Sequence, residues 1–237
     1  MLEEGIRLAK RVADMLGCSR REAELYIEGG WVTVEGKGVE LPQARVEPAQ
    51  RVEILPDAKP VPLEPVTLVL NKPPGYATAG GGRQAASLLV PQARSAQDKS
   101  GLRVVQKHFR QLECVGGLET AASGLVVFSQ DARVMRKLLD EAVYVEHEIM
   151  VEVQGQVAPA ALAALNRPNG KVSISRQQEK TTGLRFAVKG LMPGRLAQVC
   201  DEAGLVMLSM KRLRLGSVGL AGLPEGQWRY LSPGERF

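Results

Sequence analysis

A single carboxylate, Glu119, stands between a glycine pair and an apolar run in residues 115–131, which read VGGLETAASGLVVFSQD. Residues 125–128 are short, apolar and bounded by turn-forming residues, which predicts a buried strand, with a short buried helix as the alternative. Glu119 then lies on the loop that leads into this element, and such loops often carry catalytic groups. A solvated turn residue is the competing interpretation, because glutamate is usually exposed.

Other chemically reactive side chains are few. The three cysteines, Cys18, Cys114 and Cys200, are widely spaced and form no CxxC pair, so neither a disulfide framework nor a zinc site is indicated. The two histidines, His108 and His147, are too few for a histidine-rich metal site, and no Ser/His/Asp arrangement is evident from the spacing. We therefore expect no metal site and a reducing compartment.

The distribution of charge indicates a polyanionic partner. The 237 residues carry a formal net charge of +5, which suits a polyanion without requiring one. Residues 1–55 hold eight Lys or Arg against ten Asp or Glu, yet basic residues cluster in 7–21 with only Asp14 opposing them. These basic residues are Arg7, Lys10, Arg11, Arg20 and Arg21. Such a stripe is suited to following a phosphate backbone, and a solvated helix face is the alternative.

The elements that would carry these residues begin with two short helices. Apolar residues at helical spacing predict a helix over 6–16, and Gly17 is a suitable C-terminal cap. Ser19 and Glu22 form a capping-box pattern that predicts a second helix, which the glycine pair 29–30 ends. Short strands follow at 31–34, around 39 and at 51–55. Residues 56–65 contain four prolines and are expected to form a linker.

The larger part, residues 66–237, alternates strand and helix patterns without a regular βαβ repeat, which predicts an α+β fold with a mixed sheet. Strands are expected at 66–70, 125–128, 149–153, 183–188 and 206–215, and helices at 132–142 and 158–165. Residues 103–112 are ambiguous between helix and strand. The glycine run 80–82 followed by Arg83 lacks the ending of a P-loop and is expected to be a flexible loop.

No segment approaches the roughly 18 to 20 apolar residues of a membrane span. The N-terminus also lacks the charged-then-apolar layout of a signal peptide. We therefore expect a cytoplasmic protein without a membrane partner.

Residues 7–40, which read RLAKRVADMLGCSRREAELYIEGGWVTVEGKGVE, resemble the S4 RNA-binding domain. The resemblance implies a small S4 domain over 1–55, whose two helices present basic side chains to structured RNA. The basic cluster within 7–21 occupies the corresponding surface.

Four motifs occur in order along the rest of the chain, LNKPPGY, VGGLETAASGLVVFSQD, VEHEIMVEVQG and KRLRLGSVGLAGLPEGQWRYLSP. Together they resemble the S4-bearing bacterial RNA pseudouridine synthases that modify ribosomal RNA. The resemblance implies a catalytic domain over 66–237, built on a mixed, mainly antiparallel β-sheet flanked by helices. It further implies an enzyme that uses no cofactor or metal and isomerises uridine with one aspartate. We also expect a monomer that binds ribosomal RNA, or alternatively transfer RNA, here also through Lys72 and Arg195.

The chain departs from this family at positions that would line the catalytic cleft. Glu119 stands where the family has its catalytic Asp, and Gly117 stands where the family has an Arg. Ile149 replaces a Tyr that contacts the base, and His147 replaces the usual Lys. Ala197 falls at the expected position of an inward Arg.

These departures leave three interpretations open. The first is an active synthase that uses Glu119 on an RNA uridine. The second, which the coincident changes favour, is a weak or inactive pseudoenzyme that binds RNA, because misplacing a reacting group by about 1 Å can cost on the order of a hundredfold in rate. The third is a generic S4 ribosome-assembly factor, which differs from the second in its partner.

Overall fold

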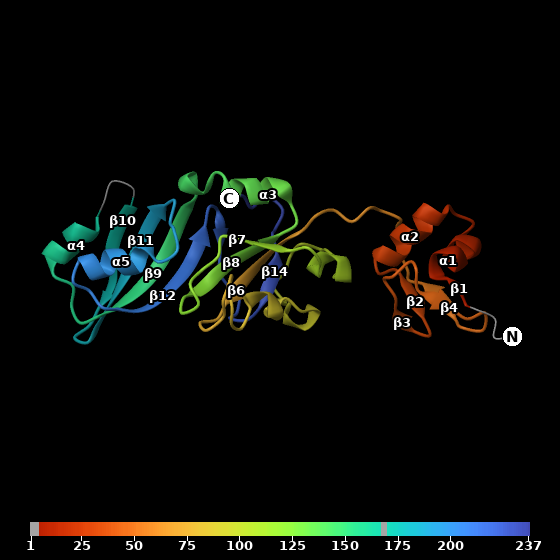
Figure 1. Cartoon of the computed structure of the whole chain (residues 1–237), viewed down its shortest axis with the longest axis horizontal. Coiled ribbons are helices and arrows are strands. Elements are labelled where there is room, and N and C mark those ends of the chain that lie inside the picture. The colour runs from red at the N-terminus through yellow and green to blue at the C-terminus, as the bar shows by residue number, and fades with distance from the viewer. Residues whose placement is uncertain (1–4, 167–169) are drawn as a thin grey trace. The chain divides into compact units, whose positions relative to one another are not determined.

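The computed structural model describes residues 5–166 and 170–237, and the chain divides into two compact units (Figure 1). Unit 1 comprises the described residues up to Pro65 together with Gly101–Arg110, and unit 2 comprises Val66–Ser100 and Gln111–Phe237. The chain therefore passes between the units three times. No helix among the described residues is long and apolar enough to cross a membrane.

Unit 1 is built on two helices, α1 (Leu8–Leu16) and α2 (Arg20–Glu28). The predicted caps are present: Gly17 ends α1 with a φ of 62°, and Ser19 and Glu22 form a complete capping box at the start of α2. The apolar faces of both helices bury Leu8, Val12 and Ile27 completely.

Short strands complete the core of unit 1. A three-stranded antiparallel sheet has the order β3 (Lys37–Gly38), β2 (Val32–Val34), β5 (Val52–Ile54). A second antiparallel pair joins β1 (Ile6–Arg7) to β4 (Arg45–Val46). The small sheet packs against the helices through Val32 and Val52.

Residues 101–110, which overlap the ambiguous stretch 103–112, also belong to unit 1. Residues 101–105 have no regular secondary structure and lead into the short 3₁₀ helix η3 (Gln106–Phe109). The Arg103 guanidinium lies 4.6 Å from the centre of the Trp31 ring, and Lys107 forms an ion pair of 2.9 Å with Glu28. Val105 is buried. This segment therefore has both polar and apolar attachments within unit 1.

Unit 2 contains a nine-stranded sheet whose main path has the order β10-β11-β9-β12-β8-β6-β14, with β13 beside β12 and β7 beside β8. The strands are β6 (Thr67–Lys72), β7 (Glu113–Val115), β8 (Ser123–Ser129), β9 (Glu146–Gln154), β10 (Gly170–Gln177), β11 (Thr181–Lys189), β12 (Met207–Leu215), β13 (Val218–Gly219) and β14 (Trp228–Tyr230). Among the pairings between the described strands only β8 with β12 is parallel, so the prediction of an α+β fold on a mixed, mainly antiparallel sheet is confirmed.

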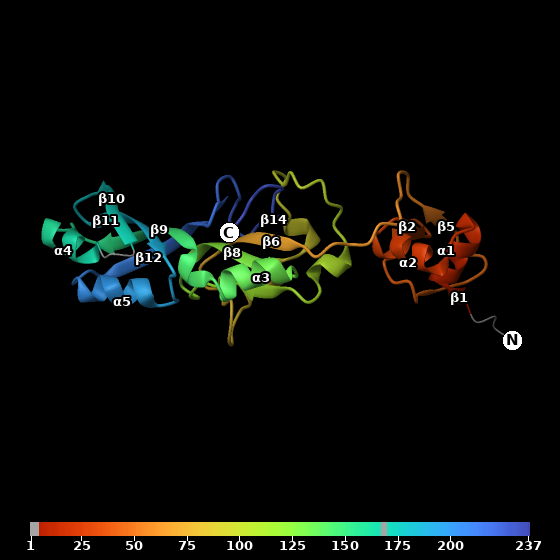
Figure 2. The ribbon, with the colours of Figure 1, turned by 90° about the horizontal axis from the view of Figure 1, so that it is seen from above.

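Helices cover parts of this sheet. They are α3 (Ala132–Leu139), α4 (Pro159–Leu165) and α5 (Arg195–Glu202), with the 3₁₀ helices η1 (Ala85–Leu88), η2 (Pro91–Ala93) and η4 (Ala142–Tyr144). Figure 2 shows α3 and α5 along the same side of the sheet. The helix expected over 132–142 is shorter than predicted, because α3 stops at Leu139 and a separate 3₁₀ turn follows.

Candidate active site

Glu119 lies on the loop between β7 and β8, as the sequence predicts for its local position. The loop is anchored on each side by apolar residues, because Val115 is buried and Leu118 is only 6% exposed. The Glu119 carboxylate is half-buried and its Oε1 accepts a hydrogen bond of 2.5 Å from the backbone N–H of Gly194. Gly194 is the N-cap of α5 and has a φ of 80°, so the carboxylate lies at the positive end of that helix.

Arg212 lies beneath this loop and was not recognised from the sequence as a site residue. It is on β12 and only 2% exposed, and its Nε donates to the Leu125 carbonyl at 2.7 Å. The guanidinium also donates to the carbonyls of Gly116 and Gly117. Burial lowers the pKa of Arg212 to about 10, while Cys114 and Glu119 act in the opposite direction, so the side chain remains a cation at neutral pH.

A glycine on β8 allows β12 to come this close. Gly124 has a φ of 102°, and a Cβ there would lie 2.2 Å from the Arg212 carbonyl oxygen. A side chain at this position is therefore excluded by both backbone conformation and space. Buried positions alternate with partly exposed ones around Arg212 on β12, which puts the side chains of Met210 and Arg212 on one face.

Lys72 is a second buried cation next to the Glu119 loop. Its Nζ donates to four carbonyls, those of Pro73, Tyr76, Thr120 and Ala122, at 2.5–3.3 Å. Burial lowers the pKa of Lys72, and the charge of Glu119 opposes that shift. The sequence assigned Lys72 to RNA binding, whereas the described contacts of its ammonium group join the 73–76 turn to the loop after Glu119.

Gly117 adjoins Thr78 rather than an open cleft. A Cβ on Gly117 would lie 2.6 Å from the Thr78 Oγ1, so even an alanine would require Thr78 to move. The same hydroxyl donates to the Leu118 carbonyl at 2.9 Å and accepts from the Leu118 N–H at 3.1 Å. Thr78 thus occupies the space beside Gly117 and holds the residue that precedes Glu119.

The other site positions named from the sequence lie on strand β9 and on helix α5. Ile149 is fully buried on β9, directly opposite Arg212 in the strand register. Ala197 is exposed on α5. Arg195 is the first residue of α5, next to Gly194, and its guanidinium donates to Gln198 at 2.8 Å.

His147 is buried on the same face of β9 as Ile149. Its Nδ1 has no hydrogen-bond partner among the described residues. Burial, with the nearby charge of Arg212, lowers the pKa of His147 to about 4. The imidazole is therefore neutral at physiological pH.

The basic residues of the 7–21 cluster, which are predicted to bind RNA, lie in unit 1 at or near the N-terminal ends of its helices. Arg7 is the N-cap of α1, with Lys10 and Arg11 close behind it, and Arg20 and Arg21 begin α2. All except the half-buried Arg11 are exposed, and they form no ion pair with another described residue. Cations at helix N-termini are intrinsically unfavourable for the helix.

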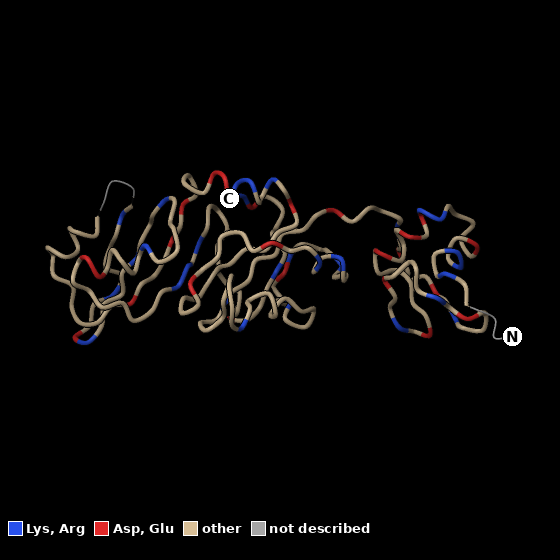
Figure 3. The backbone as a smooth tube through the Cα atoms, in the orientation of Figure 1, with Lys and Arg blue, Asp and Glu red and all other residues tan. Residues whose placement is uncertain are grey.

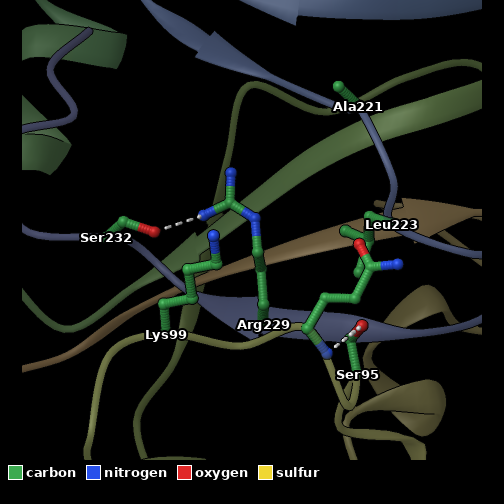
Figure 4. Close-up of a pocket in the computed structure, with 7 residues that line it drawn as sticks. Ser95, Lys99, Ala221, Leu223, Arg229 and Ser232 are labelled. Carbon is green, nitrogen blue, oxygen red and sulfur yellow. Dashed lines mark hydrogen bonds between the residues drawn. The ribbon is translucent and has the colours of Figure 1, made fainter.

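Unit 2 also has a pocket of about 470 Å³ that none of these residues line. Figure 4 shows Lys99 and Arg229 in it, next to Ser232. Both terminal nitrogens of Arg229 are held by Glu235 at 2.7 Å. Within the described residues no cluster of three or more His, Cys, Asp or Glu side chains could hold a metal ion.

No family model matches the chain. A relative from Arabidopsis thaliana, named as a candidate chloroplast pseudouridine synthase of the large ribosomal subunit, is 28% identical over 233 residues, which cover 92% of this chain and 56% of the relative. The ribosomal large subunit pseudouridine synthase B of Bacillus subtilis is 25% identical over 244 residues, which cover 97% and 93%. The chain thus spans about half of the first relative and nearly all of the second.

Among solved structures, a crystal structure of a pseudouridylate synthase matches 96% of each chain with a TM-score of 0.57 and 18% identity, which shows a common fold. Over nearly its whole length, the chain is therefore similar in sequence to curated RNA pseudouridine synthases and shares the fold of a pseudouridylate synthase.

Proposed function

We propose that the protein isomerises uridine to pseudouridine in RNA, with ribosomal RNA as the expected substrate and Glu119 as the catalytic carboxylate. The observation that carries the proposal is the fixed position of Glu119. Its carboxylate accepts a hydrogen bond at the N-terminus of α5, and the buried cations Lys72 and Arg212 donate hydrogen bonds to carbonyls next to its loop. The names of the relatives, which are those of synthases, favour turnover over a purely binding role.

The proposed reaction is an internal rearrangement. The N1–C1′ bond of the uridine breaks, and C1′ joins C5 of the same uracil, while N1 gains a proton and C5 loses one. The composition is unchanged, so no co-reactant is required. Reaching these atoms requires the uridine to leave the base stack and meet a carboxylate in a shaped pocket.

The chain's own residues would contribute positioning and charge. Preorganised groups act most strongly when their surroundings hold them in place before the reaction. Arg212 holds the loop carbonyls on the β12 side, and Lys72 holds those on the β6 side. Glutamate is one methylene longer than aspartate, and the bond to the Gly194 amide fixes the end of that longer side chain.

Unit 1 is proposed to bind the RNA as an S4 domain over residues 1–55, with 56–65 as a linker and 66–237 as the catalytic domain. The exposed cations at the starts of α1 and α2 support this role, because phosphates bind favourably at helix N-termini. Figure 3 shows Lys and Arg together with Asp and Glu in both units. The three free cysteines support a reducing, cytoplasmic compartment. A transfer RNA substrate and a monomeric state stay predictions.

The experiment is tritium release from ribosomal RNA labelled at uridine C5, taken from cells that lack this protein. We expect release by the wild-type protein and a loss of at least about a thousandfold in Glu119→Gln, because the charge is removed with little change of shape. Glu179→Gln, an exposed change outside the site, is the matched control and should retain the rate.

Two results would reject the proposal. Full activity of Glu119→Gln would remove the carboxylate from the mechanism. Absence of release from both ribosomal and transfer RNA, with RNA binding intact, would leave the interpretation as a binding protein.

A further inference from the structure

We propose that Tyr76 and Arg83 form a stacking site for a nucleobase beside Glu119, with Arg83 also available to the adjacent phosphate. The inference rests on the proposed function insofar as it takes RNA as the ligand. It assigns a role to the GGGR loop, residues 80–83, which the catalytic assignment leaves unused.

The backbone places Tyr76 next to the candidate catalytic residue. Gly75 donates its N–H to the Thr120 carbonyl at 2.7 Å, and Thr78 exchanges two hydrogen bonds with Leu118. Tyr76 and Glu119 each lie between these two points of attachment. Lys72 reinforces the junction, because its Nζ bonds the carbonyls of both Tyr76 and Thr120.

The glycine loop holds Arg83 over the tyrosine. The Arg83 guanidinium lies 4.6 Å from the centre of the Tyr76 ring. Ala77 donates to the Arg83 carbonyl at 2.8 Å and accepts from Ala85 at 2.8 Å, so the loop closes on itself. Gly80 and Gly82 have φ values of 77° and 97°, which only glycine adopts at low cost.

The Tyr76 hydroxyl and the Arg83 guanidinium both lack polar partners among the described residues. The Tyr76 hydroxyl has no hydrogen bond, and Arg83 has no carboxylate partner, among the described residues. Tyr76 is half-buried and Arg83 is exposed. The described contact of the Arg83 side chain is therefore with an aromatic face, and its positive charge remains available to an anion.

Few other aromatic side chains could serve this role. Of the ten aromatic residues, three lie in unit 1, four are buried in unit 2 and one packs against the core of unit 2: Tyr26, Trp31 and Phe109; Phe128, Phe186, Trp228 and Tyr230; and Phe237. The two that remain are Tyr76 and Tyr144, which is 73% exposed on η4. Of these, Tyr76 is joined to the Glu119 loop.

An aromatic ring paired with a guanidinium plane suits an unstacked base. Proteins that bind single-stranded RNA place bases on aromatic faces and on arginine planes, and contact phosphates with the arginine charge. A uridine extruded toward Glu119 loses its neighbours in the stack. The Tyr76–Arg83 pair would replace that stacking for the target base or for the base beside it.

The first test is photo-crosslinking with a ribosomal RNA fragment in which uridines are replaced by 5-bromouridine, which reports proximity without turnover. We expect a crosslinked peptide that contains Tyr76, retained in Tyr76→Phe and reduced at least about tenfold in Tyr76→Ala, as base–aromatic stacking energies suggest. Tyr144→Ala is the matched control and should crosslink like the wild type. An unreduced crosslink in Tyr76→Ala, or an equal loss in Tyr76→Phe, would overturn the stacking role.

The second test separates the ring from the charge. Arg83→Ala should weaken RNA binding and lower the salt dependence by about one phosphate contact, and Arg83→Lys should restore the salt dependence without restoring the planar stack. Arg136→Ala on α3 serves as the control for a lost surface cation. An affinity and salt slope for Arg83→Ala equal to those of the control would remove arginine from the site.

The two proposals fail in different ways. A crosslink at Tyr76 without tritium release would reject the synthase assignment and keep the stacking site. Tritium release that is equal in wild type and Tyr76→Ala, without a crosslink at Tyr76, would keep the synthase and reject the stacking site. Thermal unfolding of each variant shows whether it is folded.

Discussion

At the scale of single residues, the packing of the candidate site depends on Thr78 and Gly117, which lie side by side. Thr78 fills the position that a side chain at 117 would take, and its hydroxyl bonds the Leu118 peptide. Glycine at 117 leaves the space that Thr78, about forty positions earlier, fills. Substitutions at these two positions should therefore have coupled effects on stability.

Gly117→Ala tests this coupling. The new Cβ would overlap Thr78, so we expect a loss of about 1–3 kcal/mol in the free energy of unfolding, the usual cost of overpacking. Thr78→Ala removes two hydrogen bonds at about 1 kcal/mol each. The double variant should lose less than the sum of the two, and urea unfolding measures the difference. Additive losses would contradict the contact.

His147 predicts a pH dependence. Its pKa is about 4 in the folded protein against an ordinary value of 6.5, so the unfolded state takes up the proton first as the pH falls. Stability should therefore be lost between pH 6.5 and 4, by roughly 3 kcal/mol in all. His147→Gln should remove this contribution. Unfolding curves of both proteins across that range provide the measurement, and parallel profiles would show that His147 does not cause the slope.

At the scale of elements, helix α5 connects the fold to the candidate catalytic group. Its N-cap, Gly194, has a left-handed backbone and donates the N–H that Glu119 accepts. The helix therefore contributes through its N-cap residue, while its buried side chains Leu196 and Cys200 attach it to the rest of unit 2.

Gly194→Ala should reduce the rate of tritium release more than it reduces stability. The left-handed conformation costs about 1–2 kcal/mol for alanine, which would relax by rotating the amide away from Glu119. Gly204→Ala is a close control, since Gly204 has a φ of 71° and an added Cβ meets nothing within 4 Å, as at Gly194. Equal rates in the two variants would mean that the Gly194 amide has no part in positioning.

At the scale of the whole molecule, the two compact units are not consecutive in sequence. Residues 101–110 leave unit 2, contribute Val105 and Arg103 to unit 1, and return to unit 2 just before β7 and the Glu119 loop. A change in how unit 1 holds this segment would thus act on a part of the chain that leads into the candidate active site.

Val105→Ala tests whether the segment stabilises unit 1. Removing two buried methyl groups should cost about 1–3 kcal/mol, and hydrogen exchange should accelerate in α2 and β2. Val61→Ala, at a position 57% exposed, should leave exchange unchanged. Faster exchange confined to unit 2 would contradict the assignment of the segment.

RNA affinity is the second property at this scale. Replacing Arg20 and Arg21 together with alanine should weaken binding to ribosomal RNA and lower the salt slope by about one to two, because phosphate contacts release counterions. Filter binding at several salt concentrations measures both quantities. An unchanged slope would remove these arginines from the RNA interface.

Local sequence patterns predicted much of the fold. The capping box at Ser19, the glycine that ends α1 and the buried strand around 125–128 depend on residues a few positions apart, so they can be recognised in isolation. The mixed sheet followed from the same patterns. Strand β10 was missed, because it is polar and almost entirely exposed and lacks the alternation that marks a half-buried strand.

The sequence by itself determined that Glu119 lies on a loop before a buried strand, and its motifs indicated the family. Only the tertiary structure decided what surrounds that carboxylate. Arg212 reaches the loop from 95 positions away, and the turn that carries Tyr76 is joined to it from more than forty. Such contacts depend on strand order and register, which short-range periodicity does not encode. The physical site is therefore a property of the assembled sheet.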